Sequence, residues 1–213
     1  MAKQQSTKKK SVTKAITDSG QKTTNDEMNA ETVIPISQAG LPDKLNINLT
    51  EVKTAMSAEW LLARLTTWPY DTGNYYHDDH LHQVAVFFKK NSAGRYARSA
   101  TKRRRAKPVI KPVDSKPYFD RTHVIPAGYH GSEKDPRVVV GWDPDDNRGP
   151  MKDFEETVAN QNQKMDILWF TEIELVANNQ VTWETTIWDG QGQRINHGNW
   201  QGKAPFTWGS VDD

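Results

Sequence analysis

Hydrophobic and polar positions alternate most regularly in the last third of the chain. Residues 167–175 carry Ile, Trp, Thr, Ile and Leu at every second position, and residues 181–187 repeat the spacing with Val, Trp, Thr and Ile. A period of two is typical of strands with one buried face, and Asn178-Asn179 between the runs is a turn signal. The pattern predicts an antiparallel hairpin over residues 166–189.

Other apolar segments predict three further elements. Residues 84–88 form a short, purely apolar run that predicts a buried strand. The segment from Thr50 to Leu65 has apolar residues at helical spacing and stops before Pro69, which predicts a short helix capped by Thr50. Residues 151–159 predict a second helix, with acidic side chains in its first turns where the helix dipole favours them.

The composition places a boundary near residue 37. The chain has 213 residues, 35% hydrophobic and 26% charged, with a mean hydropathy of −0.82, which is polar for one folded domain. Residues 1–37 consist mostly of Lys, Gln, Ser, Thr, Asn and Asp and contain no aromatic side chain. We therefore expect a disordered polar and basic tail over residues 1–37 and an α+β domain over residues 38–213.

Several protein classes are excluded by what the sequence lacks. It contains no Cys, so disulfides, thiolate zinc sites and cysteine nucleophiles are ruled out. The longest apolar run is too short for a transmembrane helix, and the first 20 residues lack the apolar core of a secretory signal. The expected location is the cytoplasm by default, or outside the cell after export by a non-classical route.

Charge is distributed very unevenly, although the net charge is only +1. Residues 89–122 hold twelve basic side chains against two acidic ones, whereas residues 133–189 hold thirteen acidic against five basic. A concentrated positive segment attracts phosphate backbones without regard to base sequence. The predicted nucleic-acid-binding residues are Arg98, Lys102, Arg103, Arg104, Arg105 and Lys107. A solvated basic loop, or a tether that pairs with the acidic half, would explain the charges equally well.

Histidines and tryptophans cluster without forming a standard metal motif. Residues 70–82 include three histidines and three aspartates, but their spacing fits no usual ligand set, so scattered surface histidines in a glycine-punctuated loop are expected. His130 is likewise expected to be an exposed loop residue. Five tryptophans between residues 142 and 200 are expected to fill the core of a small sheet, with base stacking as the alternative.

One pair of short motifs points to specific chemistry. Asp120-Arg121-Thr122-His123 is followed, 24 residues after the histidine, by Asn147-Arg148-Gly149, and Glu155 lies eight residues after Asn147. Together they resemble the DNA/RNA non-specific endonuclease family. The ββα-metal (His-Me finger) core of that family carries Asp-Arg-Gly-His on a strand and a metal-binding Asn at the start of the following helix. Thr122 stands where the family has Gly.

The resemblance covers about residues 118–160 and the hairpin that follows. It implies a ββα-metal core with a small antiparallel sheet inside the α+β domain. It also implies a metal-dependent endonuclease that hydrolyses phosphodiester bonds of DNA and/or RNA with little sequence specificity. The implied cofactor is Mg²⁺ or another divalent cation such as Mn²⁺.

Each motif residue has a chemical role under this resemblance. His123 would be the general base, because a neutral imidazole accepts a proton near neutral pH. Asn147 would supply an oxygen ligand to the metal ion. Glu155 lies about 80° around the helix from Asn147 and would bind metal-bound water. Arg121 would neutralise a phosphate oxygen, and Asp120, on the opposite face of the strand from His123, would be structural.

Two other functions stay open on the sequence alone. The first is a non-catalytic nucleic-acid-binding protein on a degenerate nuclease scaffold, motivated by Thr122 and by the common use of Asn as a helix N-cap at positions such as Asn147. The second is an interaction protein whose basic and acidic halves pair between copies. DNA and/or RNA are the expected partners and no membrane is; an inhibitor protein and the oligomeric state are left open.

Overall fold

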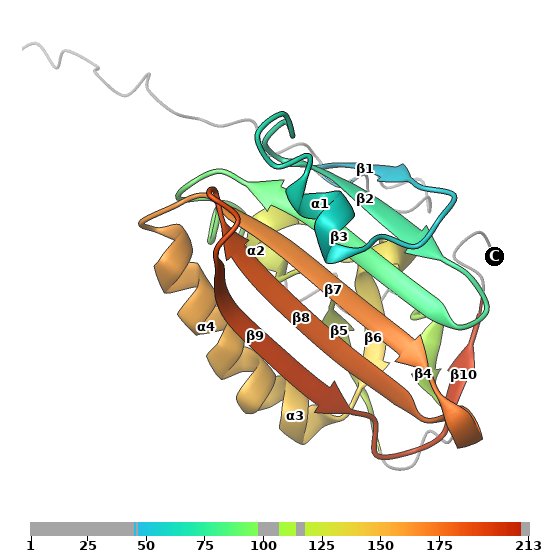
Figure 1. The fold of residues 1–213 in the computed structure, drawn as a ribbon. Helices are drawn as coiled ribbons and strands as arrows, with labels where there is room; N and C mark the ends of the chain where they lie inside the picture. The colour runs from blue at the N-terminus through green and yellow to red at the C-terminus, as the bar shows by residue number, and fades with distance from the viewer. Residues whose placement is uncertain (1–44, 46, 98–106, 114–117, 210–213) are drawn as a thin grey trace, which may run out of the picture. The chain divides into compact units, whose positions relative to one another are not determined.

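The computed structural model describes residues 45, 47–97, 107–113 and 118–209, all of which belong to the unit Ser37–Asp213 (Figure 1). The predicted tail over residues 1–37 lies outside the described residues, and so do Arg98 and residues 102–105 of the predicted nucleic-acid-binding set. Strands and helices both occur, which confirms the α+β class.

A six-stranded sheet forms the centre of the described part, in the order β1-β2-β3-β7-β8-β9 (Figure 1). Every neighbouring pair is antiparallel except β1 and β2, which run parallel. The strands are β1 (Asn48–Glu51), β2 (Thr72–His77), β3 (Leu81–Phe88), β7 (Ile167–Leu175), β8 (Val181–Asp189) and β9 (Arg194–Gln201). The centre of the sheet therefore joins β3 to β7, two segments far apart in the chain.

Both faces of the sheet bury apolar side chains, because residues on β3 and β7 alternate between two cores. Val86 and Trp169 belong to the larger core, and their neighbours Phe87 and Phe170 belong to the smaller one. The smaller core is covered by the segment that contains α1 (Ala58–Leu62). Strands buried on both faces read as continuous apolar runs, which explains the pattern of residues 84–88.

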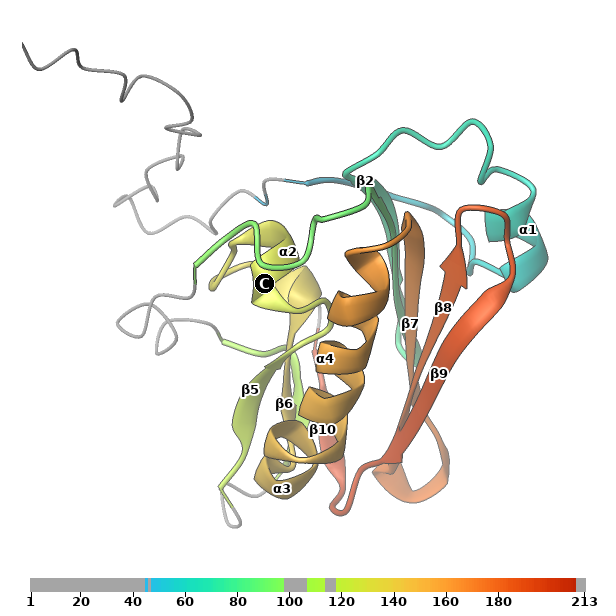
Figure 2. The same cartoon turned by 90° about the vertical axis from the view of Figure 1, so that its left-hand side faces the viewer.

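The larger core is covered by elements from the middle of the chain. These are β5 (Asp120–His123), α2 (Ala127–His130), the 3-10 helix η1 (Pro136–Val138), β6 (Val139–Trp142), α3 (Pro144–Arg148) and α4 (Pro150–Asn162). Figure 2 shows α4, β5 and β6 on one side of the central sheet and α1 on the other. Two short strands, β4 (Ile110–Pro112) and β10 (Phe206–Trp208), pair antiparallel on the same side as β6.

The hairpin and two of the other predicted elements are confirmed. β7 and β8 form the expected antiparallel hairpin, joined through the 3-10 turn η2 (Ala177–Asn179), in which Asn178 and Asn179 both have positive φ. The run 84–88 lies within β3, and the helix expected over residues 151–159 is α4.

The first predicted helix is partly wrong. Thr50 lies in β1, and the helix is only the five-residue α1, capped by Ser57, whose hydroxyl accepts a hydrogen bond from the Trp60 amide. The apolar residues do have helical spacing. Residues 48–51 nevertheless pair with β2, and the hydrogen bonds of this pairing satisfy their backbone N–H and C=O groups.

The tryptophans fill the core as expected. Trp142, Trp169, Trp183 and Trp188 are buried, and Trp200 packs against them. Trp142 and Trp183 pack in a T-shaped, edge-to-face arrangement, with ring centroids 5.2 Å apart. In the described ranges, no helix is long and apolar enough to cross a membrane.

Candidate active site

The two motif halves come together on β5, β6 and the helices that follow. β5 pairs antiparallel with β6, with Asp120 opposite Trp142 and His123 opposite Val139. The chain then enters α3, which carries Asn147, and α4, which carries Glu155. Along the chain, α2 and η1 separate β5 from β6, and α3 and α4 follow β6 directly.

Asp120 fastens α3 to β5. Its Oδ2 accepts a hydrogen bond from Asn147 Nδ2 at 3.0 Å, across 27 residues of sequence. Its two oxygens also accept from Arg148, from Nε at 2.8 Å and from a terminal nitrogen at 2.7 Å. This paired contact has the geometry in which guanidinium binds carboxylate best. The structural role expected for Asp120 is therefore confirmed.

Asn147 is not a helix cap. The N-cap of α3 is Asp143, whose side chain accepts from the Asp145 and Asp146 amides, while Gly149 precedes α4. Asn147 is instead the fourth residue of α3, and its amide nitrogen is committed to Asp120. Its oxygen Oδ1 is the remaining acceptor. The N-cap interpretation of Asn147 is therefore wrong.

Thr122 occupies an ordinary strand position. It pairs with Val140 in the β5–β6 ladder and is absent from the residues with positive φ. Glycine's conformational freedom is therefore not required at this position in the present chain. The Thr122 side chain is buried, and within the described residues its hydroxyl has no hydrogen-bond partner.

His123 is buried at the end of β5, beside a carboxylate that the sequence did not single out. The side chains of His123 and Glu133 are each 4% exposed, and His123 Nε2 lies 3.3 Å from Glu133 Oε2. This is an ion-pair distance, although the two groups are not aligned as a hydrogen bond. Glu133 falls in the polar run Ser132–Asp135, which by composition alone reads as an exposed loop.

His130 is also buried, so the prediction of an exposed loop histidine is wrong. It ends α2, and its Nδ1 accepts a hydrogen bond from the Ser132 amide at 2.9 Å. Its Nε2 therefore carries the proton and donates to the Ile125 carbonyl at 2.8 Å. Both ring nitrogens are used in the neutral form. The ring centroids of His130 and His123 are 5.6 Å apart.

Tyr129 connects the site to α4. Its ring packs against Phe88 and Trp169 in the larger core, and its buried hydroxyl has no hydrogen-bond partner in the described part of the chain. Burial raises the pKa of the Tyr129 phenol, and the negative charge of Glu155 raises it further. Arg121, on the same strand as His123, is exposed.

The residues at α3 fit a hydrated divalent cation. Amide oxygen is a hard ligand of the kind Mg²⁺ accepts, and Mg²⁺ keeps several waters. Asn147 Oδ1 is oriented by the bond from its own amide nitrogen to Asp120. Across the described ranges, no group of three or more His, Asp or Glu side chains is arranged to hold a metal ion. A single protein oxygen with water and phosphate is thus the form that a site here would take.

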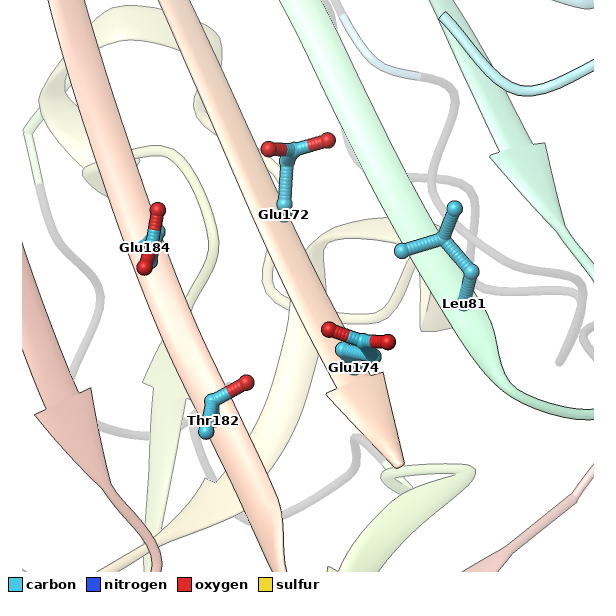
Figure 3. A pocket seen from close by; sticks show the side chains of 5 residues that line it. All are labelled: Leu81, Glu172, Glu174, Thr182 and Glu184. Atoms are coloured by element: carbon cyan, nitrogen blue, oxygen red, sulfur yellow. The ribbon is translucent and has the colours of Figure 1, made fainter. Parts of the chain in front are cut away.

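Lys107 is exposed, as the nucleic-acid-binding prediction requires. A pocket of about 240 Å³, lined by Leu81, Glu172, Glu174, Thr182 and Glu184, opens on the sheet between β3, β7 and β8 (Figure 3). By strand alternation these side chains point away from β5 and β6. Burial raises the pKa of Glu172, and the charges of Glu184 and Glu174 add to the effect.

Comparisons with protein-family models, with curated proteins and with solved structures found no match. The resemblance to the endonuclease family therefore depends on the motif residues themselves, and the argument for function on their arrangement.

Proposed function

We propose that this protein is a metal-dependent nuclease that hydrolyses phosphodiester bonds of DNA and/or RNA with little sequence preference. The observation that supports it best is the bond between Asn147 and Asp120. This bond joins Asn147, the proposed metal ligand, to β5, the strand that carries the proposed base His123. It therefore brings the two sequence motifs together in space. We propose that β5, β6 and α3–α4 are the ββα-metal core.

The side chains divide the chemistry between them. His123 takes the proton from the attacking water, and Arg121 binds a phosphate oxygen. Asn147 Oδ1 would hold Mg²⁺ or Mn²⁺. When bound, the ion would stabilise the negative charge that develops on the phosphate and on the leaving oxygen. Glu155 accepts hydrogen bonds from the water around that site. The basic segment that includes Arg98, residues 102–105 and Lys107 attracts the phosphate backbone.

A second function is favoured by one observation. The His123 side chain is only 4% exposed and its Nε2 is shielded from solvent, which is a tight setting for a group that meets substrate. A non-catalytic nucleic-acid-binding protein on the same scaffold would keep the basic segment and make no product. The two arguments first made for it are weaker, since Asn147 is no cap and Thr122 lies in a regular strand.

The deciding experiment incubates the full chain with plasmid DNA and with RNA, in Mg²⁺, Mn²⁺ or EDTA. We expect degradation that requires the metal and is lost in His123→Ala. His80→Ala is the matched control, because His80 is exposed on the turn between β2 and β3. Circular dichroism confirms that each variant folds.

Two results would go against the nuclease. Undiminished cleavage by a folded His123→Ala protein would remove the base assignment. Absence of cleavage by the unsubstituted chain, together with a salt-sensitive gel shift, would establish the binding protein instead.

A further inference from the structure

We propose that Glu133 is a positioning residue for His123, which holds the imidazole in the orientation and proton arrangement that phosphodiester hydrolysis needs. The inference rests on the proposed nuclease function and deepens it. It assigns a role to a carboxylate that lies outside both sequence motifs.

The contact between the two side chains is enclosed. Glu133 Oε2 lies 3.3 Å from His123 Nε2, and only 4% of either side chain is exposed. His123 is held in the β5–β6 ladder, opposite Val139, while Glu133 comes from the segment between α2 and η1. Two segments of different structure thus converge on one ion-pair contact.

The surroundings provide Glu133 with few other partners. Oε1 of Glu133 is buried and has no hydrogen-bond partner among the described residues. His130, whose ring centroid lies 5.6 Å from that of His123, uses both ring nitrogens on the Ser132 amide and the Ile125 carbonyl. A buried carboxylate without a counter-charge is costly, and within the described residues His123 is the group that lies at ion-pair distance from Glu133.

The neighbouring acid shows what a purely structural carboxylate looks like here. Asp135 is equally buried, but it caps η1 by accepting from the Arg137 amide and forms an ion pair with the Arg137 guanidinium at 2.6 Å. Its charge is compensated by a permanent cation within the same turn. Glu133 instead faces a side chain whose charge changes when it accepts a proton.

This arrangement has a direct chemical consequence. A carboxylate beside Nε2 favours the tautomer that carries its proton on Nε2, which leaves Nδ1 as the nitrogen that accepts a proton. The same carboxylate stabilises the imidazolium that forms once the proton has been taken, as the buried Asp does in a Ser-His-Asp triad. Glu133 thus acts on the reaction only through His123.

The test compares Glu133→Gln and Glu133→Leu with Asp135→Asn, in the full-length chain. Gln keeps an acceptor but removes the charge, and Leu removes both. The first readout is the ¹⁵N NMR spectrum of the His123 imidazole, which reports which nitrogen carries the proton. The second is the separation of kcat from KM in nucleic-acid cleavage.

We expect His123 to carry its proton on Nε2 in the unsubstituted chain and in Glu133→Gln, and to lose that preference in Glu133→Leu. We expect kcat to fall on the order of 10-fold in Gln and 100-fold in Leu with KM nearly unchanged, so that the larger loss reaches the lower end of the range ascribed to acid–base catalysis. Asp135→Asn leaves the His123 spectrum unchanged.

Four outcomes separate the two proposals. An unchanged His123 spectrum in Glu133→Leu would overturn the positioning role, and so would a changed spectrum with unchanged kcat. If Leu does not fold, an unchanged kcat in Gln overturns it. Absence of cleavage by the unsubstituted chain would overturn the nuclease alone, because the His123 spectrum still decides whether Glu133 orients the ring.

Discussion

At the residue scale, His82 shows how an imidazole can be kept neutral by its contacts. It is fully buried, and its Nε2 donates to the Arg137 carbonyl at 2.9 Å. Its Nδ1 lies 3.1 Å from His77 Nδ1. His77 in turn reaches the Gly209 carbonyl through Nε2 at 2.8 Å. Burial lowers the pKa of His82 to about 3, and the charge of His77 contributes.

The lowered pKa of His82 predicts a stability loss in mild acid. Histidine in the unfolded chain has a pKa of about 6.5. Between about pH 6.5 and 3, His82 is therefore protonated in the unfolded chain but not in the folded protein. Stability should therefore fall as the pH drops through this window, by at most about 1.4 kcal/mol per pH unit from this residue. Urea unfolding at pH 7, 6, 5 and 4 measures the slope.

The His82→Gln variant isolates that contribution. It should be less stable than the unsubstituted chain at pH 7, because it loses buried hydrogen bonds, but should lose less stability on going to pH 4. His80→Gln, at an exposed position two residues away, should keep the original slope. Equal slopes in the His82→Gln and unsubstituted proteins would contradict the assignment.

Sequence alone predicted the polar residues of the motifs but not the buried polar residues around them. His77 and His82 were expected at the surface because Gly73 appeared to mark a loop. Gly73 instead lies in β2, where a Cβ would collide with the Ala85 carbonyl and with Val86 and Leu49 side chains. Glu133 gave no signal, because burial of a carboxylate depends on a partner brought by tertiary structure.

At the element scale, the attachment of α3 to β5 determines where Asn147 points. α3 is only five residues long, and an isolated helix of that length is not stable in water. Asp120 holds it through Asn147 and Arg148, Asp143 caps it, and Lys203 bonds both Asp143 and Asp146. The helix therefore depends on side-chain bonds for its position.

Asp120→Ala should thus affect metal use more than stability. Arg148 is 66% exposed, so losing its ion pair should change the free energy of unfolding only slightly. Asn147 would lose the bond that orients its amide, and the Mg²⁺ concentration for half-maximal cleavage should rise about 10-fold. Cleavage measured over a Mg²⁺ series, with urea unfolding in parallel, tests both parts.

Asp153→Ala is the control for Asp120→Ala. Asp153 is an exposed acid in the first turn of α4, so its removal changes the charge by the same amount without touching Asn147. Equal Mg²⁺ requirements in the two variants would show that the Asp120 contact does not position Asn147.

Elements with strong periodicity were predictable, and short ones were not. The β7–β8 hairpin has two regular runs and a turn signal, and it was confirmed. β1 is four residues long, and its parallel pairing with β2 depends on chain more than 20 residues away. Such pairing leaves no local pattern, so Thr50 was misassigned to a helix.

At the scale of the whole molecule, topology was the least predictable feature. β3 pairs with β7 across a segment that includes β4, β5, β6 and four helices. Nothing in the period of either strand specifies its partner, because alternation shows which face is buried and not which strand lies alongside. The charge asymmetry, in contrast, was fully visible in the sequence, and it makes a prediction that does not depend on topology.

The concentrated basic segment predicts salt-dependent binding to nucleic acid. Binding is measured with His123→Ala protein in EDTA, so that no substrate is consumed, at several salt concentrations. Each lost phosphate contact should reduce the slope of log K against log salt by about 0.9 for duplex DNA. Replacing Arg103, Arg104 and Arg105 by Ala should therefore flatten the slope by up to about 2.7.

A second triple variant distinguishes a binding segment from net charge alone. Lys53, Lys152 and Lys164 are exposed lysines outside the basic segment, and replacing all three by Ala removes the same charge. If the basic segment itself binds the nucleic acid, the slope of log K against log salt should decrease in the arginine variant and stay unchanged in the lysine variant. Equal losses would mean that binding follows overall charge, and the arginines would then have no part in delivering the phosphate backbone to His123.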